Sequence, residues 1–159
     1  MNNTTSLKFI LLVLVLITIA CGATQRSEPA PTINYAYDYA YLGQYELAIE
    51  DLSVAIRLNP QDIIAYYNRG TAYADLEQYE LAIEDFDDAI RLDPQYAPAY
   101  NSRGTVYAEL GQHKRAIEDY SEAIRLDPQY ARSHGARGTA YANLGQYELA
   151  IEDYSEAIR

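Results

Sequence analysis

The sequence repeats itself every 34 residues, and this period constrains the fold more than any other feature. The string QYELAIED and its variant QHKRAIED recur at residues 44–51, 78–85, 112–119 and 146–153. Prolines keep the same spacing, at Pro60, Pro94 and Pro128. A period of about 20–50 residues is typical of arrays in which each repeat is one supersecondary unit that packs only against its neighbours. The period therefore predicts a stack of small, similar units.

Each unit has the pattern of two helices. In the second unit, Tyr66, Gly70 and Tyr73 are spaced four and three residues apart, which places them on one helical face. The next helix should end before Asp93-Pro94, because proline disfavours the helical conformation in the residue that precedes it. Along one face of that helix we expect Leu81, Ala82, Phe86, Ala89 and Ile90.

Glycine occupies the predicted turn between the two helices in most units. A left-handed residue commonly ends a helix, and glycine adopts that conformation without a steric penalty. Gly43, Gly111 and Gly145 fit this role, whereas Glu77 stands there in the second unit. We therefore expect the turn at Glu77 to be wider or slightly strained.

Two further sets of residues recur across each predicted hairpin. Small residues allow close helix packing, so Gly70, Gly104 and Gly138 should face Ala82, Ala116 and Ala150. Arginine recurs sixteen residues before an aspartate in the pairs Arg69 and Asp85, Arg103 and Asp119, and Arg137 and Asp153. These arginines could form an anion site, or each could bond the aspartate across its hairpin. We favour the second interpretation.

These spacings resemble the tetratricopeptide repeat, which carries an aromatic residue, glycine, aromatic, alanine, aromatic, alanine and proline at set offsets. The matching residues are Tyr66, Gly70, Tyr73, Ala82, Phe86, Ala89 and Pro94 in the second unit, Tyr100, Gly104, Tyr107, Ala116, Tyr120, Ala123 and Pro128 in the third, and His134, Gly138, Tyr141, Ala150, Tyr154 and Ala157 in the fourth. Thr32 and Ala36 depart from the pattern in the first. The resemblance implies an all-α fold, an α-solenoid of antiparallel helix pairs with about 3.5–4 repeats. Its units would span 29–62, 63–96, 97–130 and 131–159.

Residues 1–21 have the layout of a secretory signal peptide rather than of the repeat. The apolar run Phe9–Ala20 is 12 residues long, whereas a membrane-spanning helix needs about 20. Thr18-Ile19-Ala20-Cys21 resembles the lipobox of bacterial lipoproteins, although Thr18 replaces the usual aliphatic residue. This resemblance implies cleavage before Cys21, its lipidation, and a membrane-anchored protein of the bacterial cell envelope. The alternative is an ordinary cleaved signal and a secreted or periplasmic protein. Residues 22–31 then form a flexible linker before the array at 32–159.

In the tetratricopeptide family the first helices of successive units line a concave groove that holds a partner peptide. The resemblance places in this groove Asn34, Tyr37, Tyr41, Tyr67, Asn68, Thr71, Asn101 and Thr105, with Ile33, Ile64, Asp75, Ser102, Glu109, Arg132, Thr139 and Asn143 at further positions. In some relatives, lysines and arginines in the groove hold a terminal carboxylate. Those positions are occupied here by Tyr67, Thr71, Asn101 and Thr105, so this carboxylate clamp is absent. A backbone-holding ladder of asparagines is interrupted at Ser102 and Ala136. Two interpretations of Tyr37, Tyr41 and Tyr67 remain open. They contact a bound peptide, or they only cover a frayed first unit.

Composition disfavours several other functions. The 23 acidic and 12 basic residues give a net charge of -11, which disfavours binding to the negatively charged phosphates of nucleic acid. We expect no catalysis, no cofactor and no metal site, because no nucleophile has an evident base and no phosphate-binding glycine loop occurs. His113 and His134 occupy packing positions. The acidic run at Glu84–Asp88 is interpreted as a solvated helix face.

The function that we predict is a protein–protein interaction scaffold, or adaptor, that binds a peptide segment of another protein. Two alternatives remain open. The chain could be a structural module that forms a homo-oligomer through the last helix, expected at 147–159 with part of its apolar face uncovered. It could also bind a small molecule or glycan in the groove.

Overall fold

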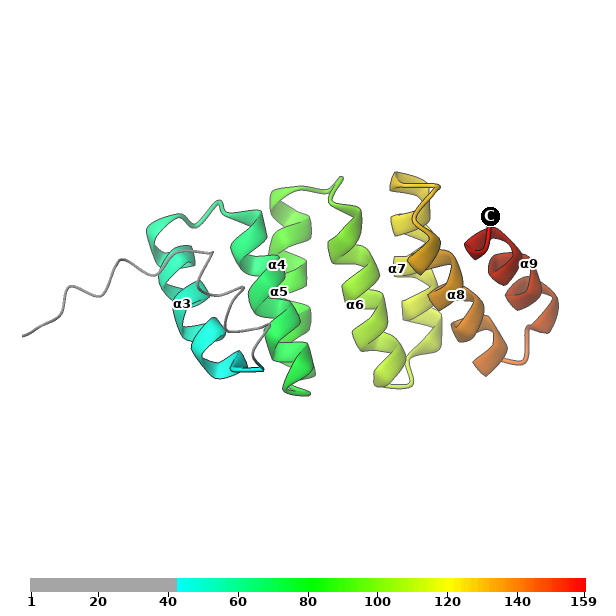
Figure 1. The fold of residues 1–159 in the computed structure, drawn as a ribbon, viewed down its shortest axis with the longest axis horizontal. Coiled ribbons are helices and arrows are strands. Elements are labelled where there is room, and N and C mark those ends of the chain that lie inside the picture. The colour runs from blue at the N-terminus through cyan, green and yellow to red at the C-terminus, as the bar shows by residue number, and fades with distance from the viewer. Residues whose placement is uncertain (1–42) are drawn as a thin grey trace, which may run out of the picture. The chain divides into compact units, whose positions relative to one another are not determined.

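The computed structural model describes residues 43–159, and every regular element in that range is an α-helix. The helices are α3 (Tyr45–Leu58), α4 (Ile63–Asp75), α5 (Tyr79–Leu92), α6 (Ala97–Glu109), α7 (His113–Leu126), α8 (Ala131–Asn143) and α9 (Tyr147–Ala157) (Figure 1). The predicted all-α fold is therefore confirmed.

Consecutive helices pack side by side in the order of the chain. Helices α4 and α5, α6 and α7, and α8 and α9 form hairpins, while α3, α5 and α7 each also contact the helix that follows (Figure 1). The first helices also touch one another, α4 with α6 and α6 with α8. Among residues 43–159 the second helices have no comparable contacts, so the first helices lie closer to one another along one side of the array. This arrangement is the predicted α-solenoid, with α3 and three complete hairpins in the described range.

The turn inside each hairpin is closed by the same backbone hydrogen bonds. The N–H of Gln78 donates to the carbonyl of Tyr73 at 2.9 Å, and Gln112 and Gln146 repeat this bond to Tyr107 and Tyr141. Such a bond needs a left-handed residue just before its donor. Gly111 and Gly145 have φ of 71° and 74°, and Glu77 adopts 57°. The strain that we expected at Glu77 is therefore present, because this residue has a side chain and nevertheless adopts a positive φ.

The buried residues of the second helices alternate between small and large. Ala82 and Ala116 are fully buried, and Phe86 and Tyr120 are 1% and 2% exposed. Leu81 does not belong to this face, because 42% of it is exposed. Its predicted place in the core is therefore wrong. Five residues of an α-helix turn through about 500°, so Leu81 lies about 140° from Phe86 around the axis and cannot share its narrow buried face.

The recurring glycines lie against aromatic rings. A Cβ atom on Gly70 would come within 2.9 Å of Cε1 of Phe86, and one on Gly104 within 2.9 Å of Cε1 of Tyr120. The ring one helical turn beyond Ala82 or Ala116 is thus the nearest group to each of these two glycines. At Gly138, the Tyr154 ring lies at 3.0 Å and the carbonyl of Ala150 at 3.2 Å.

Candidate functional site

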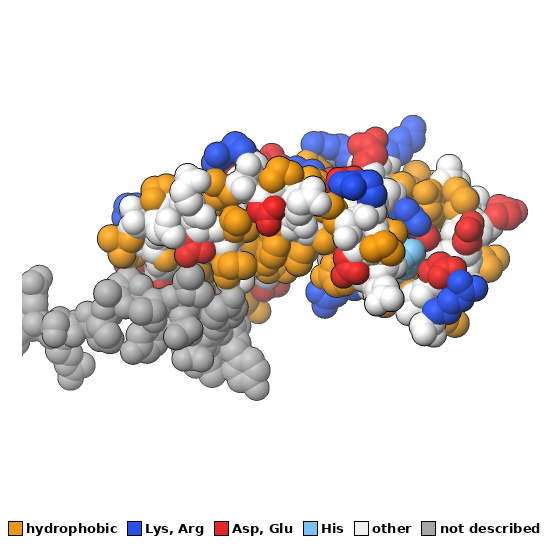
Figure 2. Space-filling view, turned by 90° about the horizontal axis from the view of Figure 1, so that it is seen from above, with side chains coloured by type: hydrophobic (Ala, Val, Ile, Leu, Met, Phe, Trp, Pro, Cys, Tyr) orange, Lys and Arg blue, Asp and Glu red, His pale blue; other side chains and the backbone are white. Residues whose placement is uncertain are grey.

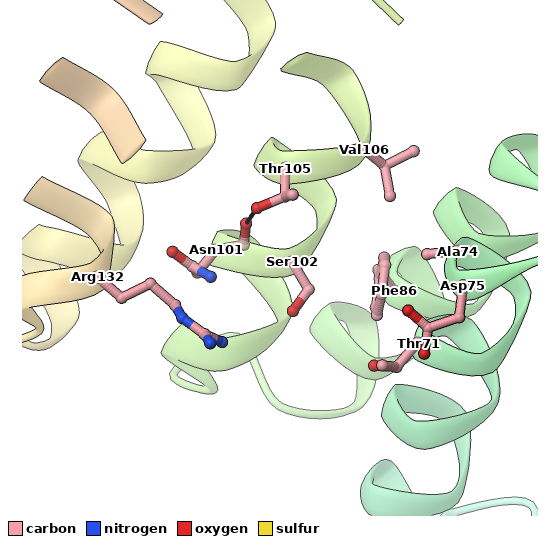
Figure 3. A pocket seen from close by; sticks show the side chains of 9 residues that line it. All are labelled: Thr71, Ala74, Asp75, Phe86, Asn101, Ser102, Thr105, Val106 and Arg132. Atoms are coloured by element: carbon pink, nitrogen blue, oxygen red, sulfur yellow. Dashed lines mark hydrogen bonds between the residues drawn. The ribbon is translucent and has the colours of Figure 1, made fainter. Parts of the chain in front are cut away.

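A pocket of about 420 Å³ opens among the first helices of the second, third and fourth units. Its lining residues are Thr71, Ala74, Asp75, Phe86, Asn101, Ser102, Thr105, Val106 and Arg132 (Figure 3). Its volume lies within the range of about 300–1,000 Å³ that is usual for ligand pockets. Most of these side chains come from α4 and α6, so the pocket is part of the inner surface of the array.

Opposite charges stand at the two sides of this pocket. Asp75 projects from the end of α4, and Arg132 reaches in from the start of α8, with Asn101 and Ser102 between them (Figure 3). Desolvation raises the pKa of the Asp75 carboxyl above its ordinary value. Phe86 and Val106 form the wall behind Asp75 and are only 1% and 2% exposed. The pocket can therefore receive a group that is charged at two points.

Asn101 is held in a fixed orientation at the side of the pocket near Arg132. It is only 3% exposed, and the hydroxyl of Ser133 donates to its Oδ1 atom at 2.9 Å. This bond uses the acceptor end of the carboxamide and leaves the amide nitrogen, a donor, on the other side. The Arg132 guanidinium is also a donor only. This side of the pocket therefore favours an acceptor such as a carboxylate.

The two predicted threonines have their protons committed to their own helices. Thr71 donates to the carbonyl of Tyr67 at 2.9 Å, and Thr105 donates to that of Asn101 at 3.0 Å (Figure 3). The hydroxyl of Tyr120 donates to Thr105 in turn, at 3.3 Å. A threonine whose proton is used can only accept further bonds. Thr71 therefore adds an acceptor to the side of the pocket that holds Asp75.

Tyr67 and Asn68 lie on α4 but do not line the pocket. The ring of Tyr67 is half-buried at the joint between the second and third units, where it meets Tyr96 edge-on with 5.4 Å between ring centroids. Its hydroxyl accepts a bond from Ser102 at 3.4 Å. Asn68 is half-buried and already engaged in an interaction. Tyr67 thus supports the packing between units.

Five predicted site residues fall outside the range 43–159. These are the groove residues Ile33, Asn34, Tyr37 and Tyr41 and the lipidation candidate Cys21. Their roles stay predictions. The structure adds Ala74, Phe86 and Val106 to the lining. The sequence predicted Phe86 only as a core residue, because an aromatic residue that recurs at this position of the repeat indicates packing. The pattern gave no indication that Phe86 also borders a pocket.

Each recurring arginine braces its own hairpin. Arg69 donates from Nε and Nη2 to Asp85 at 2.8 and 2.7 Å, and the other two pairs have the same two distances. The predicted Arg–carboxylate bond is therefore confirmed. Burial raises the pKa of Asp85, and its bonds to Arg69 act in the opposite direction. Because Asp85 is only 3% exposed, the run Glu84–Asp88 is not the fully solvated face that we predicted.

Acidic and basic side chains are interspersed on the face of the array that Figure 2 shows. Residues 43–159 contain no cluster of His, Cys, Asp and Glu side chains that could hold a metal ion. No helix among them is both long and apolar enough to cross a bilayer.

Comparisons with known proteins agree with this geometry. A TPR repeat family model matches residues 36–76 and 104–145, more than half of the chain, and two tetratricopeptide repeat models match 63–96 and 86–118. The crystal structure of MamA protein is similar at 31% identity and a TM-score of 0.73, covering 79% of this chain and 69% of that one. MamA 41-end from Desulfovibrio magneticus RS-1 has 25% identity and a TM-score of 0.75, covering 84% and 76%.

A third solved structure, the first TPR of Spaghetti (RPAP3) bound to the HSP90 peptide SRMEEVD, shares the fold at 24% identity and a TM-score of 0.68, covering 70% of this chain and 89% of that one. A search of curated proteins found no match. The repeat pattern, the stacked hairpins and the family match together show that this chain belongs to the tetratricopeptide repeat family.

Proposed function

We propose that this chain is a protein-interaction scaffold that holds a segment of a partner protein against its first helices, and that binding rather than catalysis is its activity. The observation that carries this proposal is the polarised pocket between α4, α6 and α8. The structure of a related fold with a bound peptide gives further support.

The pocket also suggests the chemistry of the bound segment. Arg132 and the amide nitrogen of Asn101 favour a carboxylate, while Asp75 and the Thr71 hydroxyl favour a cationic group. Charge complementarity of this kind sets orientation and specificity more than raw affinity. The expected ligand is a peptide segment that carries an acidic and a basic residue a short distance apart.

A selection from random peptides tests this proposal. The wild-type protein should enrich peptides that carry both charges, and Arg132→Glu should lose the preference for the acidic residue and keep the basic one. Lys114→Glu on α7 makes the same charge change at an exposed position outside the pocket lining and is the matched control. A selection in which all three proteins enrich the same peptides, or none, would refute the proposed groove.

We further propose that Cys21 anchors the scaffold to a membrane of the bacterial cell envelope. The support is the lipobox-like sequence that ends at Cys21. Several acyl chains on one residue give stable membrane binding without a spanning helix. Mass spectrometry of the mature N-terminus should find an acylated Cys21, and Cys21→Ala should move the protein from the membrane fraction to the soluble one. An unmodified N-terminus beyond residue 21 would contradict the anchor and leave the groove proposal intact.

A further inference from the structure

Every complete hairpin has a threonine at the same repeat position of its first helix. In the third unit the hydroxyl of Tyr120 donates to Thr105 at 3.3 Å, and in the fourth unit that of Tyr154 donates to Thr139 at 3.2 Å. Both threonines also donate their own protons to the backbone carbonyl four residues earlier. The tyrosine therefore uses one of the two lone pairs with which the threonine can still accept hydrogen bonds.

The second unit has the threonine but not the tyrosine. Thr71 donates to the carbonyl four residues earlier at 2.9 Å, but the residue at the tyrosine position is Phe86, which has no hydroxyl. The ring itself is placed as in the third unit. Its Cε1 atom would lie 2.9 Å from a Cβ atom on Gly70, the same distance as between the Tyr120 ring and a Cβ atom on Gly104. Among residues 43–159 no tyrosine hydroxyl donates to Thr71, so both of its lone pairs are open to a ligand.

This difference between the units lies at the pocket. Thr71 and Phe86 both line it, together with Asp75 one turn further along α4. The Thr71 hydroxyl and the Asp75 carboxylate point to the same side, towards the inside of the pocket (Figure 3). An ionised carboxylate only accepts hydrogen bonds, and so does a hydroxyl whose proton is already used. This end of the pocket therefore presents two acceptors, one of them charged, to a cation that donates hydrogen bonds.

The arrangement of the two acceptors distinguishes between the two kinds of basic side chain. Thr71 and Asp75 are four residues apart, so they follow one another along the helix axis with a rise of about 6 Å between their Cα atoms. A guanidinium is a planar fork that matches two acceptors in one plane, whereas an ammonium is a compact charge with three donors in different directions. We propose that this end of the pocket binds the primary ammonium of a lysine side chain, and that Phe86 in place of tyrosine is the residue that admits it. This inference rests on the proposed function and adds which basic residue is bound.

The fourth unit provides a matched control. Tyr154 donates to Thr139 there, and Asn143 stands at the repeat position of Asp75. Tyr154→Phe therefore opens an acceptor on Thr139 but creates no cation site, because Asn143 carries no charge. It is the reverse of Phe86→Tyr at the equivalent position, and it lies outside the pocket lining.

Titration of the protein with n-butylammonium chloride, followed through the backbone amide signals of α4 by NMR, tests the ammonium site directly. At constant ionic strength, the signals of Thr71 and Asp75 should shift to saturation in the wild type and in Tyr154→Phe. Phe86→Tyr places a hydroxyl beside Thr71 and should weaken binding about tenfold, the usual effect of one hydrogen bond to a charged group. Thr71→Val removes the acceptor without adding volume and should have a similar effect. The n-butylguanidinium ion should bind more weakly than n-butylammonium.

The selection from random peptides separates this inference from the proposed function. Phe86→Tyr should lose the enrichment of lysine and keep that of the acidic residue, which is the reverse of the result expected for Arg132→Glu. If Phe86→Tyr enriches lysine as the wild type does, the inference is wrong and the proposed function stands. If no peptide is enriched by any of the proteins, the proposed function is wrong and the titration decides the inference. Equal n-butylammonium binding by Phe86→Tyr and wild type, no saturable shift in the wild type, or tighter binding of n-butylguanidinium would each overturn the ammonium site.

Discussion

Arg103 of α6 holds Asp119 of α7 through two hydrogen bonds, at 2.8 Å from Nε and 2.7 Å from Nη2, and its Nη1 atom also donates to Asp87 of α5. One guanidinium therefore joins both helices of its own hairpin and the second helix of the preceding unit. Arg69 and Arg137 make the same third contact with a serine hydroxyl, Ser53 or Ser121, at 3.0 Å.

Removing the aspartate of this brace should destabilise the fold strongly. Asp119→Ala leaves the Arg103 charge, whose side chain is 18% exposed, without its main partner. Leaving a buried charge without a partner costs about 3 kcal/mol or more. Asp87 keeps one bond to Arg103, so the loss of stability should approach that value without exceeding it. Urea unfolding measures this change.

The surface pair of Asp88 and Arg91 is the control for that measurement. Their side chains are 41% and 62% exposed, so Asp88→Ala should leave the unfolding midpoint almost unchanged. If Asp119→Ala were equally mild, the brace would contribute little to stability.

The glycines of the first helices should respond to alanine in opposite directions. Gly104→Ala places a Cβ atom 2.9 Å from the Tyr120 ring and should cost about 1–3 kcal/mol through overpacking. At Gly135 the nearest atom is 3.9 Å away, so Gly135→Ala should stabilise α8 by up to about 1 kcal/mol through helix propensity. Thermal unfolding of both variants checks the pair. A lower Tm for Gly135→Ala would contradict the available space.

The turn at Glu77 is a second place where one substitution should stabilise the protein. A left-handed conformation costs a residue with a side chain about 1 kcal/mol, and Glu77→Gly should recover most of that energy. Gly111→Ala is the reverse experiment, since its φ is 71° and no atom lies within 4 Å of the added Cβ. Chemical denaturation should therefore give changes of opposite sign, and the same sign for both would exclude backbone strain as the cause.

Peptide binding in the pocket should depend on the protonation of Asp75. Its carboxylate attracts a cationic group only above its pKa, and desolvation raises that pKa above the value of about 3.9 for an ordinary aspartate. As the pH is lowered, affinity for a selected basic peptide should therefore fall. The fall should begin at a higher pH than it would if Asp75 had the pKa of an ordinary aspartate. Fluorescence anisotropy across mildly acidic pH measures this effect. Asp75→Asn should bind weakly and lose that pH dependence, and an unaltered profile would remove Asp75 from the site.

Local features were predicted well because their causes are local. Pro94 and Gly111 limit helices through their own backbone geometry, and the strained φ of Glu77 follows from a missing glycine. The Arg103–Asp119 bond was also foreseen, since a repeated pair sixteen residues apart spans one hairpin of nearly constant length.

The sequence alone determined the period, the paired helices, their turns and the arginine braces, because each depends on residues within one repeat. Only the tertiary structure decided that the Phe86 ring is the nearest group to Gly70, and that Ser133 orients Asn101 from 32 residues away. It also brought Asp75 and Arg132 to one pocket. These relationships depend on how successive units pack on one another, and that geometry comes from the combined shapes of many side chains.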